Sequence, residues 1–356
     1  MTSGDLLLYG CNGYTGELIA REAAARGLRP ILAGRRRLPV AALAGELSLP
    51  HRVFPLDDAP ALAAGLRGVA AVLHCAGPFS TTSRPMAEAC LAARTHYVDI
   101  TGELSVFREL LARDAAARAA GVTLLPGAGL DVVPSDCLAA QLARRLPGAS
   151  RLDLALLALG GVSHGTALTM VEMLGQPGAV CRGGRLQDSP LGALSRDVDF
   201  GRGPVRCLSV PWGDVLTAHV STGIPDITTY VAMPRAARLG MRLARLSGGL
   251  LVAAPVRRAL AARVNRQPGG PTPAQREAGR CLLWAEARDE RGGRAEARLT
   301  VPEGYAFTVH SALALAQRAL EGALPPGFQT PSRACGADFV LGLPGVRAEP
   351  GGVAAG

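Results

Sequence analysis

A glycine-rich turn near the N-terminus constrains the fold of this chain most strongly. An apolar stretch at residues 5–9 predicts a buried strand, the segment Gly10-Cys11-Asn12-Gly13-Tyr14-Thr15-Gly16 follows, and a helical pattern then runs to Arg26. Gly10 allows a tight exit from the strand, Gly13 leaves room for a phosphate beside the backbone, and Gly16 allows close packing of helix on sheet. The free N–H groups and the dipole at the start of this helix favour the phosphates of a dinucleotide.

The spacing G-x-x-G-x-x-G is one residue longer than the common G-x-G-x-x-G. Three glycines alone are weak evidence, but a strand before them, a helix after them and a second strand at residues 30–34 indicate a dinucleotide-binding unit. The alternative is a glycine turn in an α/β domain that binds no ligand. The cofactor-binding residues predicted here are Gly10, Asn12, Gly13, Tyr14, Thr15 and Gly16.

The end of the second predicted strand indicates which cofactor is preferred. An NAD site usually places Asp or Glu there, to accept a hydrogen bond from the ribose 2′-hydroxyl. This chain instead has Gly34 followed by Arg35, Arg36 and Arg37. Guanidinium groups match a 2′-phosphate in charge and geometry, so we predict NADP, bound by Arg35 first and Arg36 second. The alternative is that the arginines form a solvated loop.

The composition is that of a globular protein long enough for two domains. The chain has 356 residues, of which 48% are hydrophobic and 19% charged, and its formal net charge is +9. All of the basic residues are arginines, so a lysine Schiff base or lysine acid–base chemistry is excluded. The arginines are scattered and lack an accompanying aromatic platform, which argues against nucleic-acid binding.

The cysteines and the hydropathy pattern predict a reduced, cytoplasmic protein without a metal. None of the eight cysteines forms a C-x-x-C pair, and no zinc or Ser-His-Asp pattern stands out. The first strand starts at once, so we expect no signal peptide. No apolar run reaches about 18 residues, so we expect no membrane-spanning helix.

Alternating strand and helix patterns up to residue 125 predict an α/β fold with a doubly wound Rossmann domain. The expected strands are residues 5–9, 30–34, 51–54, 70–75, 96–100 and 122–125. The expected helices are residues 15–26, 38–47, 58–66, 82–94 and 103–120. Ligands bind at the carboxyl ends of such strands, where loops 75–79, 97–103 and 126–136 lie. The first loop adds Ala76, Gly77 and Pro78 to the predicted cofactor site.

Several segments together resemble the saccharopine dehydrogenase-like oxidoreductase family, in the bacterial branch that includes the trans-acting enoyl reductases. The segments are 10–16, 32–35, 76–79, 97–103, 127–136, 221–226, 270–272 and 327–332. Cys11-Asn12 departs from the Ala-Thr pair that is commoner in this family. The resemblance covers nearly the whole chain. It implies a nicotinamide-binding domain and a second α/β domain that covers the nicotinamide and often forms a homodimer.

We expect an NADP-binding domain at residues 1–130, an α+β substrate or dimerisation domain at 131–305, and a C-terminal helix and tail at 306–345 that return to the first domain. The second domain is predicted to hold strands at 152–159, 206–211 and 227–233, a helix at 165–175, and a hairpin over 281–301. Residues 235–265 alternate arginines with apolar residues. This pattern predicts contact with a membrane surface or an acyl substrate, or an ordinary surface or dimer-interface helix pair. The residues from about 347 onward are expected to be disordered.

The catalytic residues are harder to predict than the cofactor site. Our candidates are Tyr97, Asp99 and His310, with Tyr305, His164, Glu103 and Asp131 as further titratable groups near the loops. Asp99, Glu103 and Asp131 could equally cap helices. Three functions stay open: an NADP-dependent reductase of an activated double bond such as an enoyl group, a C–N bond oxidoreductase of the saccharopine type, and a nucleotide-binding scaffold without activity. The substrate would be a small or acyl-type molecule.

Overall fold

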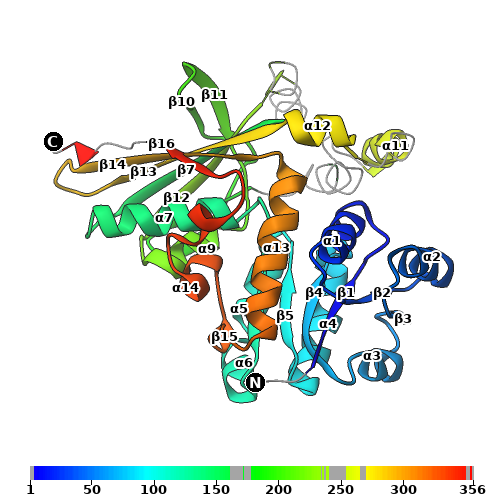
Figure 1. Cartoon of the computed structure of the whole chain (residues 1–356). Coiled ribbons are helices and arrows are strands. Elements are labelled where there is room, and N and C mark those ends of the chain that lie inside the picture. The colour runs from blue at the N-terminus through cyan, green and yellow to red at the C-terminus, as the bar shows by residue number, and fades with distance from the viewer. Residues whose placement is uncertain are drawn as a thin grey trace. The chain divides into compact units, whose positions relative to one another are not determined.

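The computed structural model describes residues 4–160, 171, 178–233, 235, 238–239, 254–264, 270–349 and 353–354. The chain divides into two compact units (Figure 1). The first unit combines Met1–Val133 with Tyr305–Pro344, and the second combines Pro134–Gly304 with Gly345–Gly356. None of the described helices is long and apolar enough to span a membrane.

The first unit contains a seven-stranded parallel sheet of Rossmann type. Its strands are β1 (Asp5–Tyr9), β2 (Ile31–Gly34), β3 (His51–Val53), β4 (Val69–His74), β5 (His96–Asp99), β6 (Thr123–Leu125) and β15 (Gly327–Phe328). The spatial order is β15-β6-β5-β4-β1-β2-β3. The strand order reverses between β1 and β4, and dinucleotides bind at the carboxyl ends of strands beside such a reversal.

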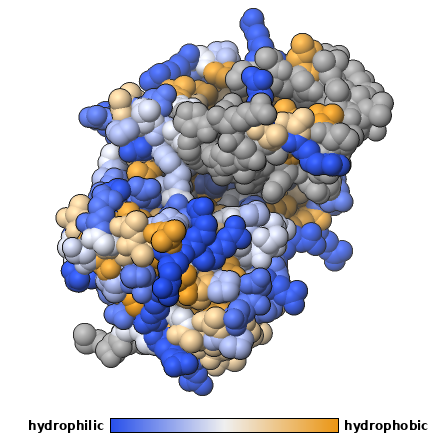
Figure 2. All heavy atoms as spheres, turned by 90° about the vertical axis from the view of Figure 1, so that its right-hand side faces the viewer, coloured by the Kyte–Doolittle hydropathy of each residue, from blue (hydrophilic) through white to orange (hydrophobic). Residues whose placement is uncertain are grey.

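Helices cover this sheet, and most of its strand residues are fully buried, as expected for a parallel sheet. The helices are α1 (Tyr14–Ala25), α2 (Arg37–Leu47), α3 (Ala59–Gly65), α4 (Phe79–Ala93), α5 (Leu104–Leu111), α6 (Asp114–Ala120), α13 (Gly304–Leu320), α14 (Pro331–Cys335) and the 3-10 helix η2 (Phe339–Gly342). Figure 1 shows α13 beside α1, in agreement with the contact between His310 and Arg26. The surface over α1–α3 mixes hydrophilic side chains with small hydrophobic patches (Figure 2), which is typical of solvent-facing helices.

One predicted helix of the first unit was wrong in its extent, and the unit contains a strand that was not predicted. The helix expected at residues 103–120 is two helices, α5 and α6, because the Arg113 guanidinium donates to the Glu109 carbonyl oxygen (2.9 Å) and so satisfies the end of α5. The segment after Pro325, predicted to be a tail that packs on the first domain, lies in the first unit and also supplies the edge strand β15. The Asp114 carboxylate holds β15 by accepting a hydrogen bond from the Phe328 N–H (2.7 Å).

The second unit contains a mixed sheet in the order β10-β11-β12-β7-β13-β14-β16. Its strands are β7 (Arg151–Leu159), β8 (Gly178–Arg182), β9 (Arg185–Ser189), β10 (Ser195–Asp199), β11 (Pro204–Ser209), β12 (Asp226–Ala232), β13 (Arg280–Arg288), β14 (Arg294–Pro302), β16 (Arg347–Glu349) and β17 (Val353–Ala354). Its helices include α7 (Val133–Arg145), α9 (Asp214–Thr222), α11 (Ala254–Val264) and α12 (Pro273–Ala278). The predicted β13–β14 hairpin is confirmed, with Leu283 opposite Leu299.

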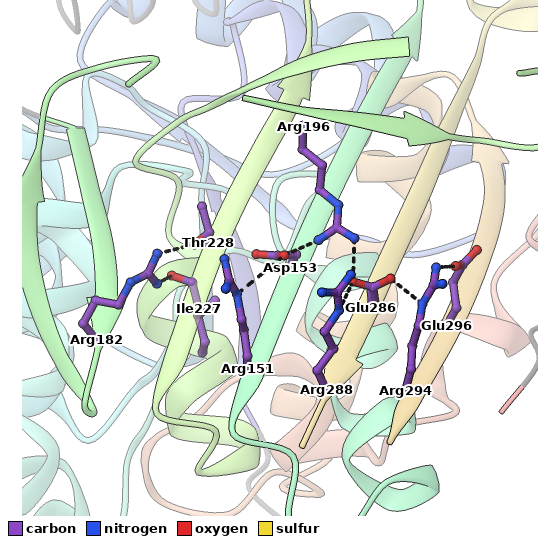
Figure 3. Close-up of polar contacts among 10 residues, drawn as sticks. All are labelled: Arg151, Asp153, Arg182, Arg196, Ile227, Thr228, Glu286, Arg288, Arg294 and Glu296. Atoms are coloured by element: carbon purple, nitrogen blue, oxygen red, sulfur yellow. Dashed lines mark hydrogen bonds and ion pairs between the residues drawn. The ribbon is translucent and has the colours of Figure 1, made fainter. Parts of the chain in front are cut away.

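Two rows of charged side chains cross β14, β13 and β7 in register. Arg294, Arg288 and Arg151 form one row, and Glu296, Glu286 and Asp153 form the next. Figure 3 shows the Arg196 guanidinium, from β10, bound to both Asp153 and Glu286. The Arg196 guanidinium carbon also lies 4.6 Å from the ring centroid of Trp284. Trp284 belongs to a small hydrophobic cluster that includes Val198 of β10 and Cys207 of β11. A buried ion cluster therefore holds the β10–β11 hairpin on the sheet.

The C-terminal tail also differs from prediction. Residues 347–349, expected to be disordered, form β16 and pair with β14, for example Ala348 with Leu299. The predicted helix at 165–175 lies outside the described residues except for position 171, and His164 lies outside them as well. The same holds for most of segment 235–265, in which the described part is α11 and residues 235, 238 and 239.

Candidate functional site

The turn between β1 and α1 requires its glycines for steric reasons. Gly10 has φ +85°, and a Cβ there would lie 2.7 Å from the Ala76 nitrogen, in the loop after β4. A Cβ on Gly16 would lie 2.2 Å from the Gly10 carbonyl oxygen. The Gly10 N–H donates to the Ala33 carbonyl oxygen (2.8 Å), which ties the turn to β2. The first helix is therefore brought against the end of β1 more closely than any side chain would allow.

The N-terminus of α1 has no side-chain cap. Gly13 is the N-cap residue and provides no side chain to satisfy the first N–H groups of the helix. Tyr14 and Thr15, which follow it, are half-buried. The Asn12 side-chain oxygen lies 3.0 Å from the position of a Cβ on Gly34, so Asn12 reaches the end of β2. A backbone cradle without side chains beside an uncapped helix start fits the pyrophosphate of a dinucleotide.

The three arginines predicted to include the 2′-phosphate ligands follow directly on β2. Arg35, Arg36 and Arg37 are exposed, and Arg36 is the N-cap residue of α2. Within the described chain neither Arg35 nor Arg36 forms an ion pair with a carboxylate. Burial raises the pKa of Tyr9 to about 12, while the positive charge of nearby Arg35 opposes that rise. Because Tyr9 pairs with Ala33 in the sheet, Arg35 follows β2 beside the end of β1.

The loop after β4 packs directly against the glycine turn. The Cys75 N–H donates to the Tyr9 carbonyl oxygen (2.8 Å), and Ala76 lies against Gly10. Gly77 and Pro78, which are joined by a cis peptide bond, are exposed at the carboxyl edge of the sheet. The structure thus brings the predicted cofactor residues of this loop together with those of the first turn.

A second helix start at this edge is already occupied by a carboxylate. Glu103, from the loop after β5, accepts hydrogen bonds from the backbone N–H groups of Phe79 (2.9 Å) and Ser80 (2.7 Å) at the start of α4. The local sequence predicted that this helix begins at residue 82, but α4 begins at Phe79. The contact with Glu103 explains the earlier start. It also leaves the start of α1 as the better of these two places for phosphates.

The predicted catalytic residues Tyr97 and Asp99 are both fully buried. The Tyr97 hydroxyl donates to Asp99 Oδ2 (2.7 Å), and Asp99 Oδ1 accepts from the N–H groups of Thr101 (2.9 Å) and Gly127 (3.0 Å). Burial raises the pKa of Asp99 to about 6, although these hydrogen bonds oppose the rise. An acid that ties two loops together in this way is better suited to positioning than to contact with a substrate.

His310, the third predicted catalytic residue, lies away from the glycine turn. Its Nδ1 atom is 2.5 Å from the guanidinium of Arg26, the C-cap residue of α1, whereas the phosphates would bind at the opposite end of that helix. Burial lowers the pKa of His310, and the charge of Arg26 lowers it further. A neutral histidine at this position fits a contact between α13 and α1. Tyr305, one turn earlier in α13, makes an edge-to-face contact with Tyr14 at 5.0 Å between ring centroids.

His74 is a buried titratable residue that the sequence analysis did not select. It ends β4 and packs between the rings of Tyr9 and Phe79. Burial lowers the pKa of His74 to about 3, so the ring is neutral. Its Nε2 atom lies 3.1 Å from the Thr82 hydroxyl, which itself donates to the Ala76 carbonyl oxygen (2.6 Å). In the sequence, His74 could have been selected because it follows an apolar strand, at the edge of the sheet where ligands bind.

Asp131 lies in the loop after β6, beside the loop after β5. A Cβ on Gly102 would lie 2.6 Å from Asp131 Oδ2, so this carboxylate packs on the Gly102 α-carbon. Helix α13 holds the loop: the Thr308 hydroxyl accepts from the Leu130 N–H (3.1 Å) and the Ser311 hydroxyl donates to the Ala128 carbonyl oxygen (2.7 Å). Burial raises the pKa of Asp131 to about 6, while the side chain keeps partial access to solvent.

Comparisons with known sequences agree with this geometry. A Mycobacterium tuberculosis protein named as a trans-acting enoyl reductase is 34% identical over 186 residues, which are 48% of this chain and 44% of that protein. A trans-acting enoyl reductase from Mycobacterium leprae is 34% identical over 150 residues, which are 40% of this chain and 36% of that protein. The matches therefore span less than half of these curated relatives.

Solved structures with little sequence identity share the fold. The L-Glu-forming saccharopine dehydrogenase of Saccharomyces cerevisiae has a TM-score of 0.64 at 12% identity, covering 99% of this chain and 100% of that chain. The homospermidine synthase of Legionella pneumophila, solved with NAD, has a TM-score of 0.65 at 11% identity, covering 95% and 88%. Residues 6–125 match the family described as the saccharopine dehydrogenase NADP binding domain. Residues 6–125, which hold the glycine turn and six strands of the parallel sheet, are thus similar to the saccharopine dehydrogenase NADP binding domain.

Proposed function

We propose that this chain is an NADP-dependent oxidoreductase that reduces an activated carbon–carbon double bond, such as that of an enoyl substrate. The observation that carries the proposal is the match of residues 6–125 to an NADP-binding domain, together with a turn whose glycines leave room for phosphates. The names of the mycobacterial relatives support the enoyl part of the proposal.

The glycine turn and the loop after β4 would hold the cofactor. The backbone at Gly10–Gly16 would bind the pyrophosphate, and Arg35 and Arg36 would bind the 2′-phosphate, with Asn12 close by. Ala76, Gly77 and Pro78 would lie beside the nicotinamide half. The bound dinucleotide supplies a hydride, and the protein orients the substrate and supplies a proton. Tyr97 and Asp99 would act by fixing the loops after β5 and β6.

Binding measurements on the purified chain test the cofactor assignment. NADPH and NADH are titrated by calorimetry against the wild type, Arg35→Ala and, as a neighbouring control of equal charge, Arg37→Ala. We expect tighter binding of NADPH than of NADH. Loss of one charge-assisted bond in Arg35→Ala should weaken NADPH binding about 10- to 100-fold with little change for NADH. Equal preference in the wild type and in Arg35→Ala would contradict the role of Arg35.

Turnover measurements test the reaction. Oxidation of NADPH in the presence of an enoyl thioester would support the proposal. Turnover only with an imine or a saccharopine-like substrate would instead favour C–N bond chemistry, and tight NADPH binding without turnover on either class would favour a scaffold. A small or acyl-type substrate, a homodimer, a cytoplasmic location and contact of segment 235–265 with a membrane surface stay predictions.

A further inference from the structure

Three carboxylates lie at the end of β5 and in the loops that follow β5 and β6, and two of them are hydrogen-bonded within the fold. Asp99 accepts three hydrogen bonds, and Glu103 accepts two from the start of α4. Asp131 differs, because it forms no hydrogen bond or ion pair anywhere in the described parts of the chain. It is nevertheless held in place, since its carboxylate packs on Gly102 and its loop is anchored by Thr308 and Ser311.

An acid that is crowded by protein but left without a partner costs stability in its ionised form. Such groups cluster at functional sites, where the protein retains them for their chemistry. The position of Asp131 agrees with this, because it lies on the β4–β5–β6 half of the sheet, at the edge where ligands bind. The residue is partly exposed.

We propose that Asp131 is the general acid of the reduction and gives a proton to the substrate. This inference rests on the proposed function. As the double bond is reduced, its π bond breaks, one carbon gains the hydride of NADPH, and the carbon next to the activating group gains the proton of the Asp131 carboxylic acid. NADPH is oxidised by two electrons, the substrate is reduced by two, and the Asp131 carboxylate then takes up a proton from solvent.

The electrostatic surroundings are compatible with this role. A pKa of about 6 keeps a fraction of Asp131 protonated near neutral pH, as a general acid requires. The titratable groups on the elements that pack around its loop are Asp99 at the end of β5, Glu103 on the loop after β5, Arg108 and Glu109 on α5, and Tyr305, His310 and Arg318 on α13. None of them forms an ion pair with Asp131 in the described chain, and burial is the cause of its raised pKa.

The experiment compares the wild type with Asp131→Asn and with a control, Asp5→Asn, an exposed acid at the start of β1. The carboxyl groups of each purified protein, labelled with carbon-13 at aspartate, are titrated by NMR without ligand. The rate of NADPH oxidation with crotonyl-CoA as the probe is then measured against pH. For Asp131→Asn we expect loss of one carboxyl titration near pH 6, an NADPH affinity within about threefold of wild type, and a kcat lowered by about 100-fold or more.

The outcomes separate this inference from the proposed function. If Asp131→Asn kept the wild-type kcat and pH profile, or if its aspartate titrations matched those of the wild type, the role of Asp131 would be overturned while the reductase proposal stood. A wild type that bound no NADPH would overturn the proposed function itself. The Asp5→Asn control should match the wild type in every measurement.

Discussion

The Tyr97 hydroxyl donates a hydrogen bond to Asp99, 2.7 Å away, inside the first unit, where neither side chain reaches solvent. Because Asp99 also accepts from the Thr101 and Gly127 N–H groups, one carboxylate joins the loops after two neighbouring strands. We expect Asp99→Asn to lower the free energy of unfolding by about 2–4 kcal/mol, since an amide cannot accept all three bonds. Chemical denaturation checks this, and Asp5→Asn should be near neutral. Equal stabilities would contradict the positioning role.

The glycine turn offers a sharp steric test. Gly16→Ala should remove NADPH binding and destabilise the fold, because its Cβ would lie 2.2 Å from the Gly10 carbonyl oxygen. Gly45→Ala, in the helix α2, is the matched control, since a Cβ at that position has nothing within 4 Å. It should raise stability by about 0.5–1 kcal/mol. Calorimetric titration and thermal unfolding measure both effects, and normal NADPH affinity in Gly16→Ala would refute the proposed cradle.

Removing the cap at the start of α4 should weaken the first unit. In Glu103→Ala the Phe79 and Ser80 N–H groups lose their acceptor, so we expect a loss of about 1–3 kcal/mol in the free energy of unfolding. Glu46→Ala, which breaks an exposed ion pair with Arg21, is expected to have little effect, because water and salt screen exposed charges. Urea denaturation compares the two variants. A similar small loss in both would show that the cap contributes little.

The ion cluster in the second unit predicts a large effect at one arginine and a small one at its neighbour. Arg196→Met removes the cation that the buried carboxylates of Asp153 and Glu286 share. Glu286 keeps Arg288 and Arg294, but Asp153 keeps only Arg151 at 3.9 Å, so we expect a loss of about 2–4 kcal/mol. Arg206→Met breaks only the exposed pair with Asp197 and should change stability by about 0–1 kcal/mol. Denaturant unfolding that ranked the two variants equally would argue against a clamp on the β10–β11 hairpin.

The raised pKa of Asp131 predicts a pH dependence of stability. A carboxyl whose pKa rises from 3.8 to about 6 on folding binds more protons in the folded state. The stability that this group contributes is therefore present below about pH 4 and is lost as the pH rises through 6. Asp131→Asn should consequently unfold at a higher temperature than the wild type at pH 8, by an amount worth at most ~3 kcal/mol, and at nearly the same temperature at pH 4. A difference of the opposite sign would mean that the ionised carboxylate has a partner.

Local patterns in the chain were sufficient for the first unit's main elements. Apolar runs predicted β1, β2, β4 and β5, and the glycine spacing predicted the turn into α1, because strand burial and backbone freedom are properties of neighbouring residues. The position of Arg35 after β2 followed from the same reasoning.

Contacts between residues far apart in the sequence determined the start of α4, the pairing of β15 and the surroundings of the acidic residues. Glu103 accepts hydrogen bonds at the start of α4 from 24 residues away, and β15 pairs with β6, about 200 residues earlier. The local sequence of α4 or of β15 therefore does not determine where these elements form. Tyr97 and Asp99 carry the residue types of an acid–base pair, and only the packing around them shows that they are buried. Residue type alone does not distinguish the roles of Asp131 and Asp99. Their hydrogen bonds separate them, because the chemistry of a carboxylate depends on the donors that the folded chain brings to it.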